Sequence, residues 1–159
     1  MSTPLAVHEA SARWPSGGRA PAAAPDLSTP AAAAAALRSY FRIASAWGLS
    51  NDEQQRLLGC GRSTFFDWKA GRVRSALDAA TLERLSHLFA VYAALHILLP
   101  LPERADAWLR QPNTAPLFGG GSALQRMLGI RGNLGDYAHG QQYQDIVDQL
   151  FQAASGAAK

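Results

Sequence analysis

The stretch that decides the fold is NDEQQRLLGCGRSTFFDWKAG, residues 51–71. Its spacing is typical of a helix-turn-helix, because two short helical segments, 51–58 and 62–70, flank a glycine turn. Gly59 follows two leucines at the position where a left-handed residue ends a helix, and Gly71 ends the second segment. The inward-facing side chains of such a motif are here Leu58, Cys60, Phe65 and Trp68.

A plain helical hairpin in a small α-domain would show much of the same pattern. Phe66 and Asp67 fall near the outward face of the second helix, where neither suits close contact with phosphates. Gln55 stands where many such motifs have a small residue that lets the two helices approach. The pattern of residues 51–71 therefore leaves both interpretations open.

Helix signals continue on both sides of this stretch. Thr29 followed by Pro30 predicts an N-cap and a helix over 30–47. Ser50 with Glu53, and Ser122 with Gln125, form two capping boxes. Further helices are expected at 77–99, 103–110, about 122–129 and 134–153. No segment alternates apolar and polar residues as a half-buried strand does, so the predicted fold class is all-α.

Composition divides the chain into three parts. Residues 1–28 are rich in alanine and proline and poor in large apolar side chains, which predicts a disordered tail. Residues 29–101 contain the helix-turn-helix and a long apolar helix. Residues 102–159 are expected to form a second, small helical domain.

Several classes of protein are disfavoured by composition. With one cysteine, Cys60, among 159 residues, neither a disulfide framework nor a cysteine-rich zinc site is expected. The longest apolar run, 89–101, is too short to span a bilayer as a helix. The first residues lack a basic start followed by an apolar stretch, so no secretory signal is expected. A cytoplasmic protein without a membrane span is the resulting prediction.

Positive charge is concentrated in one part of the chain. The net charge is +3, yet residues 38–74 alone hold seven basic and three acidic side chains, a surplus of 4. Residues 75–101 have a net charge of −1, and the two remaining parts are neutral. This concentration predicts contact with a polyanion, although a solvated basic face without a partner fits the charge equally well.

Duplex DNA is the polyanion that suits a helix-turn-helix. The second helix of the motif lies in the major groove, so its first residues, Arg62, Ser63 and Thr64, are expected to approach base edges or phosphates. Lys69, Arg72 and Arg74 are expected to contact the DNA backbone. Arg62 is the best candidate for reading a base, because a guanidinium donates two parallel hydrogen bonds to guanine.

No arrangement of residues predicts catalysis, a metal site or a cofactor. His8, His87, His96 and His139 are scattered, and His96 lies on an apolar helix. The glycine-rich run 119–122 lacks the lysine of a phosphate-binding loop and follows no strand. An enzyme is therefore the least supported of the function classes considered.

The order of these elements resembles the Xre/MbcA/ParS antitoxins of bacterial type II toxin–antitoxin pairs. The resemblance covers residues 38–130, through the helix-turn-helix, the run LFAVYAALHILLP and the run WLRQPNTAPLFGGGSALQRMLG. Its most specific residues are Trp108, Leu109, Pro112, Asn113, Phe118, Gly119, Gly120, Ser122 and Leu124. It implies an all-α, usually dimeric protein whose C-terminal domain binds a RES-type toxin that consumes NAD⁺ and whose helix-turn-helix represses its own operon.

The chain departs from the family pattern at two places. Ala123 stands where the family commonly has proline, and the last helix lacks the usual Arg-rich Tyr-Leu-Asp segment. The toxin contacts expected on that helix are Tyr137, Tyr143, Ile146 and Phe151, because aromatic and aliphatic side chains anchor interfaces. These residues could instead pack back on their own domain, and a stand-alone DNA-binding regulator without a toxin is the alternative function.

Overall fold

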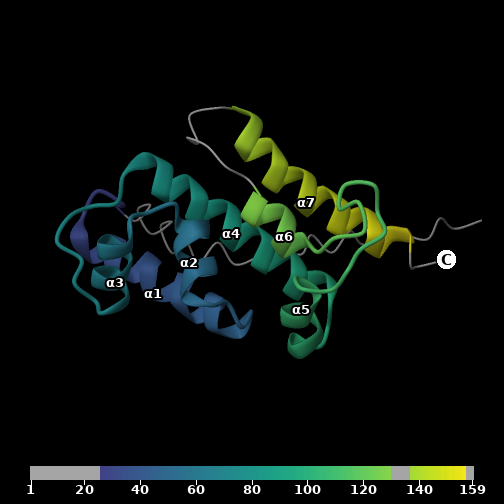
Figure 1. Ribbon diagram of the computed structural model, residues 1–159, viewed down its shortest axis with the longest axis horizontal. Helices are drawn as coiled ribbons and strands as arrows, with labels where there is room; N and C mark the ends of the chain where they lie inside the picture. Colours follow the sequence, from purple (N-terminus) through teal and green to yellow (C-terminus); the bar gives the residue numbers. More distant parts are fainter. Residues whose placement is uncertain (1–25, 130–136, 157–159) are drawn as a thin grey trace, which may run out of the picture.

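The computed structural model describes residues 26–129 and 137–156, and in the last helix it describes the side chains of 141–152. These residues form helices α1 (Pro30–Ala46), α2 (Asn51–Leu58), α3 (Arg62–Lys69), α4 (Ala79–Leu98), α5 (Pro102–Trp108), α6 (Ala123–Gly129) and α7 (Tyr137–Gly156) (Figure 1). Within the described ranges there is no strand, and one isolated antiparallel bridge joins Pro112 to Ser122. The predicted all-α class is confirmed.

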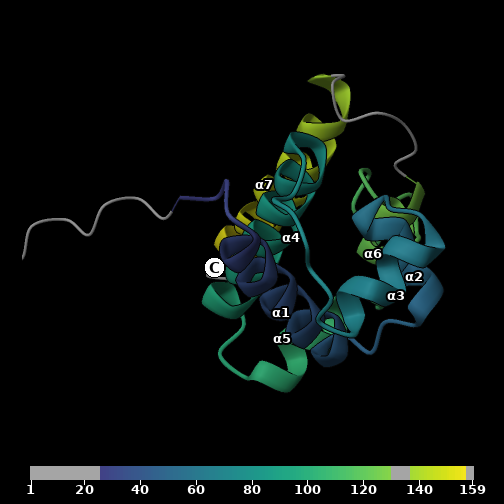
Figure 2. The same ribbon diagram turned by 90° about the vertical axis from the view of Figure 1, so that its left-hand side faces the viewer.

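Helix α4 forms the centre of the core. Helices α1, α2 and α5 contact it, and α7 lies along it in the same direction (Figures 1 and 2). A helix that is covered on several sides needs apolar residues around most of its circumference, and α4 has them. Its buried apolar residues are Leu85, Leu88, Val91, Ala94 and Leu95. No described helix combines the length and the apolar character that crossing a membrane requires.

The predicted caps are present. Thr29 Oγ1 accepts a hydrogen bond from the Ala32 N–H at 3.1 Å, and Pro30 is the first residue of α1. The Ser50 N–H donates to Glu53 Oε2 at 2.8 Å while the Glu53 N–H donates to Ser50 Oγ at 3.2 Å. Ser122 and Gln125 make the same reciprocal pair, at 2.9 and 3.1 Å. These caps leave fewer helix-end N–H groups unsatisfied.

Several predicted helix boundaries need correction. The helix predicted over 103–110 is α5, which begins at Pro102 and ends at Trp108. Helix α4 begins at Ala79 and not at residue 77, because Asp78 is its N-cap and accepts from the Thr81 N–H at 2.7 Å. Helix α7 extends to Gly156 instead of ending at 153. Residues 134–136 of that prediction lie outside the described residues, as do residues 1–25 of the predicted tail.

The loop between α5 and α6 is held by the residues that carry the family resemblance. The Trp108 and Phe118 rings meet edge to face with centroids 5.9 Å apart. The Asn113 N–H donates to the Gly121 carbonyl at 2.9 Å, and its own carbonyl accepts from the Gly120 N–H at 3.1 Å. Trp108, Asn113 and Phe118 thus hold this loop in place.

Candidate nucleic-acid interface

The turn between α2 and α3 is fixed by a glycine and a glutamine. Gly59 has a φ of +67°, and a Cβ at this position would lie 2.7 Å from Arg84 Nε, so a side chain here would be both strained and crowded. The Gln55 side-chain amide donates to the Cys60 carbonyl at 3.2 Å and so closes the turn. Gln55 therefore stabilises the helix-turn-helix, although the sequence pattern favours a smaller residue there.

Helices α2 and α3 are anchored to α1 by buried groups. The Tyr40 hydroxyl donates to the Gln54 carbonyl at 2.8 Å, and the Gln54 amide donates to the Leu49 carbonyl at 2.7 Å. Phe65 is fully buried, and its ring centroid lies 6.0 Å from that of Phe41 on α1. These contacts fix the orientation of α3 relative to the rest of the domain.

The predicted inward-facing residues are confirmed. Leu58 and Phe65 are buried, while Cys60 and Trp68 are partly buried and pack against the core. Burial raises the pKa of the Cys60 thiol above its ordinary value. Since a raised pKa disfavours the nucleophilic thiolate, Cys60 behaves here as a small apolar residue.

The first turn of α3 is exposed and carries Arg62, Ser63 and Thr64. Its N-cap is Gly61, whose lack of a side chain leaves the N–H groups of this turn without a side-chain cap. Helix N-termini with open N–H groups attract anions. The Arg62 guanidinium carbon lies 5.2 Å from the centre of the Phe66 ring. The Phe66 ring therefore makes a cation–π contact with Arg62 on this face.

The other three predicted DNA-binding residues are also exposed, but they differ in their partners. Lys69 Nζ donates to Asn51 Oδ1 at 2.5 Å and lies 5.6 Å from the centre of the Phe65 ring. Arg72 donates to Asp67 Oδ1 twice, from Nε at 2.9 Å and from Nη2 at 2.6 Å. Arg74 makes no hydrogen bond or ion pair with any described residue.

The predicted toxin-contact residues on α7 have different environments. Tyr143 and Ile146 are 1% and 0% exposed, so the expectation that both face a partner is wrong for the protein in this conformation. Phe151 is 44% exposed. The side chain of Tyr137 lies outside the described residues.

Tyr143 and Ile146 are buried because α4 offers the nearest apolar surface. The Tyr143 ring stacks on His87 of α4, with ring centroids 5.3 Å apart and planes 6° from parallel. Burial also raises the pKa of the Tyr143 hydroxyl to about 12. The alternative of packing back on the domain holds for these two residues.

Arg110 joins the C-terminal part of the chain to the helix-turn-helix, a contact that the sequence pattern does not reveal. Its Nη2 donates to the Gly48 carbonyl at 2.7 Å and to Glu53 Oε2 at 2.8 Å, and its Nε donates to the Trp47 carbonyl at 3.2 Å. Hydrogen bonding to Arg110 lowers the pKa of Glu53. Farther along, Arg56 Nη2 of α2 donates to the Leu128 carbonyl of α6 at 3.1 Å.

Comparison with known proteins covers most of the chain. The family model of the antitoxin Xre-like helix-turn-helix domain matches residues 26–90, which include α1 to α3 and part of α4. An uncharacterized protein of Sinorhizobium fredii, y4oB, is 48% identical over 112 residues, which are 70% of this chain and 82% of that protein. No solved structure matches. With the fold described above, the chain therefore belongs to the family of y4oB and carries an antitoxin Xre-like helix-turn-helix domain at residues 26–90.

Proposed function

We propose that this protein is the antitoxin of a type II pair, which neutralises a RES-type toxin and represses its own operon as a dimer. The observation that carries the proposal is the exposed first turn of α3, with Arg62, Ser63 and Thr64 on a helix-turn-helix of the Xre-like antitoxin family. The RES type of the toxin rests on the resemblance of residues 108–124.

In the proposed complex, α3 enters the major groove of operator DNA. Arg62 reads a guanine with two parallel hydrogen bonds, and Ser63 and Thr64 contact neighbouring bases or phosphates. Lys69, Arg72 and Arg74 contact the backbone. A dimer supports this mode because two half-sites multiply the affinity of a motif with a small footprint.

The toxin-binding function is proposed for residues 102–159, supported along α4. Because α7 uses Tyr143 and Ile146 to pack on α4, the proposed contact surface is the outer side of α7, with Phe151 as its described anchor. Phe151 is one of the few large apolar side chains that are exposed on the described part of the chain. Aromatic side chains of this kind often become buried hot spots of an interface.

Co-expression with the cognate toxin tests this proposal in the full-length chain. The adjacent reading frame is expected to encode a toxin that arrests growth, and the wild-type protein is expected to restore growth. Phe151→Asp should abolish the rescue, because it places an unpaired charge in the proposed interface. Leu27→Asp, which places the same charge at an exposed apolar residue before α1 and outside residues 102–159, is the matched control and should still rescue.

Two outcomes would contradict the proposal. Rescue by Phe151→Asp as complete as that by the wild type would remove α7 from the toxin interface. An adjacent gene without toxicity, beside a protein that still represses its promoter, would favour the stand-alone regulator.

A further inference from the structure

Helix α1 carries two exposed arginines that the proposed DNA contacts on α3 do not include. Arg38 and Arg42 are one helical turn apart, and neither makes a hydrogen bond or ion pair with any described residue. Helix α1 contains no acidic residue, so nothing within it neutralises the pair. Like charges at this spacing repel each other, which makes an unpaired arginine pair a cost to the free protein.

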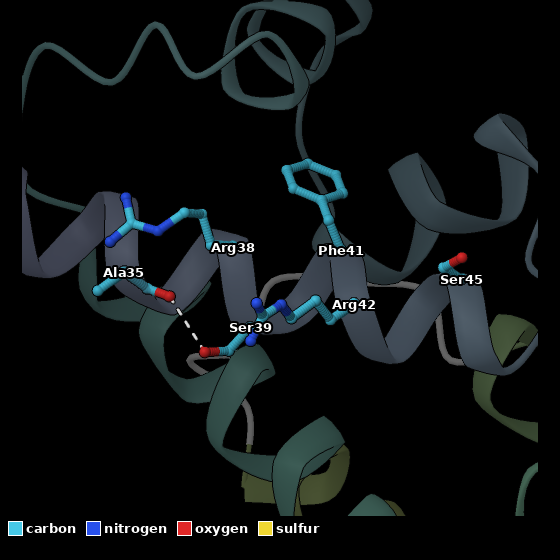
Figure 3. Close-up of a pocket in the computed structure, with 6 residues that line it drawn as sticks. All are labelled: Ala35, Arg38, Ser39, Phe41, Arg42 and Ser45. Carbon is cyan, nitrogen blue, oxygen red and sulfur yellow. Dashed lines mark hydrogen bonds between the residues drawn. The ribbon is translucent and has the colours of Figure 1, made fainter.

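The two arginines border an open hollow on the surface of α1. The hollow has a volume of about 540 Å³. Figure 3 shows the side chains of Arg38 and Arg42 running along α1 toward Ala35 and Ser39, while the Phe41 ring points away from the helix. Ser39 and Ser45 complete the polar part of its wall. The Ser39 hydroxyl donates to the Ala35 carbonyl at 3.1 Å, drawn as the dashed line in Figure 3. The wall thus combines two cations and hydroxyl groups with no acidic side chain.

This hollow continues into the surface that borders α3. A second hollow, of about 440 Å³, is lined by Lys69 together with Phe41 and Ser45, which also line the first. The Phe41 ring contacts Phe65 of α3 as described above. The arginine pair on α1 and Lys69 at the end of α3 therefore lie on one continuous surface.

We infer that Arg38 and Arg42 form a second binding site for the phosphodiester backbone of duplex DNA, which extends the α3 interface over α1. The inference rests on the proposed DNA-binding function. A backbone that passes Lys69 continues over the shared wall of Phe41 and Ser45 and reaches the arginine pair. Guanidinium groups bind phosphate oxygens with two parallel hydrogen bonds, so each arginine can neutralise one phosphate.

DNA suits this surface better than an acidic protein partner for two reasons. The hollow is continuous with Lys69, which the proposed function already assigns to the DNA backbone. The surplus positive charge of residues 38–74 also has Arg38 and Arg42 at one end and the α3 contacts at the other. A single polyanion that crosses both α1 and α3 accounts for six of the seven basic residues of this segment, and the seventh, Arg56, donates to the Leu128 carbonyl.

The salt dependence of DNA binding tests this site. The full-length wild type, Arg38→Gln/Arg42→Gln and a matched control, Arg104→Gln/Arg126→Gln, are titrated onto a labelled duplex of random sequence at several salt concentrations. Arg104 and Arg126 are exposed on α5 and α6, so the control loses the same charge outside α1 and α3. Two lost phosphate contacts should reduce the slope of log K against log salt by about 1.8, since each contributes about 0.9. The control should keep the wild-type slope.

The outcomes separate the failure of this inference from that of the proposed function. Equal slopes for the α1 variant and the control, while the wild type binds, would overturn the inference and leave DNA binding intact. A folded wild type that does not bind duplex DNA would overturn both. An α1 variant that binds DNA normally but no longer binds the toxin would assign the site to a protein partner and likewise overturn the inference.

Discussion

The two surfaces predicted from the sequence, one on α3 with the loop after it and one on α7, differ in how the fold treats them. All six residues predicted for the first surface are exposed. Of the four residues predicted for the second surface, Tyr143 and Ile146 are buried, Phe151 is partly exposed, and the side chain of Tyr137 lies outside the described residues. The difference follows from chemistry. Arginine and lysine side chains stay at the surface, because burying an unpaired charge costs free energy. Tyrosine and isoleucine side chains are found both in protein cores and in interfaces.

The contrast shows what an apolar stripe on a helix can and cannot indicate. Such a stripe requires a cover, but the pattern does not say whether a neighbouring helix or another protein supplies it. Helix α4 supplies the cover for α7 here. A stripe of charged side chains is easier to interpret, because burying it in the core would cost free energy that few neighbouring groups compensate.

The largest expected effect is the loss of stability on truncation of Tyr143. Tyr143→Ala should lower the free energy of unfolding by about 3–5 kcal/mol, because it opens a cavity between α4 and α7 and removes the stack on His87. Phe151→Ala removes a ring that is 44% exposed and should cost less, about 1–2 kcal/mol. Urea unfolding measures both. Similar costs for the two variants would remove the distinction between the inner and outer sides of α7.

The next effect concerns the α3 surface and should leave stability almost unchanged. Arg62→Ala should lose about 1–3 kcal/mol of discrimination between the operator and a site with a substituted guanine. Arg74→Ala should instead weaken binding to all sequences alike and reduce the salt slope by about 0.9. Fluorescence anisotropy with the two duplexes separates these outcomes. If Arg74 proved to carry the discrimination and Arg62 did not, the orientation proposed for α3 would be wrong.

The smallest effect tests the contact that Arg110 makes between the C-terminal part of the chain and the helix-turn-helix. Arg110→Gln should cost about 1 kcal/mol at neutral pH, because part of the Arg110 side chain is exposed and its pair with Glu53 is screened. The folded state lowers the pKa of Glu53 from an ordinary 4.5, so its contribution is full above 4.5 and is lost as the pH falls through the lowered value. The difference between wild type and variant should therefore shrink in acid.

Urea unfolding across this pH range measures that difference. Glu53→Gln is the control, because glutamine preserves the capping box with Ser50 while removing the charge. A difference that stays constant with pH would assign the stabilisation to the bonds from Arg110 to the Trp47 and Gly48 carbonyls.

Local rules predict much of this fold. The caps at Thr29, Ser50 and Ser122 depend on residues three positions apart, so the sequence shows both partners of each hydrogen bond. The turn at Gly59 depends on a conformation that glycine adopts at little cost. Asp78 is an N-cap like Ser50, but the sequence pattern places the start of this helix at Leu77, because Leu77 fits the apolar spacing of the helix.

Contacts between distant residues account for what the sequence does not predict. The partners of Arg110 are two backbone carbonyls and Glu53, and carbonyls leave no mark in a sequence. Gln55 is exceptional for its position, and only the geometry of the turn shows that its amide reaches the Cys60 carbonyl. The arginine pair on α1 is visible in the sequence, but its continuity with Lys69 depends on how α1 packs against α3.

Helix α4 also bears on how this protein can evolve. It contacts α1 and α2 of the helix-turn-helix and, on another side, α7. Recombination near codon 102 could replace the C-terminal part of the chain. The last helix of the new part would then have to pack on the original α4. Successful exchanges would need matching changes in α4, which the DNA-binding half inherits. Under the proposed function, selection for a new toxin would thus also change the half that carries the helix-turn-helix, and the two proposed specificities would be inherited together.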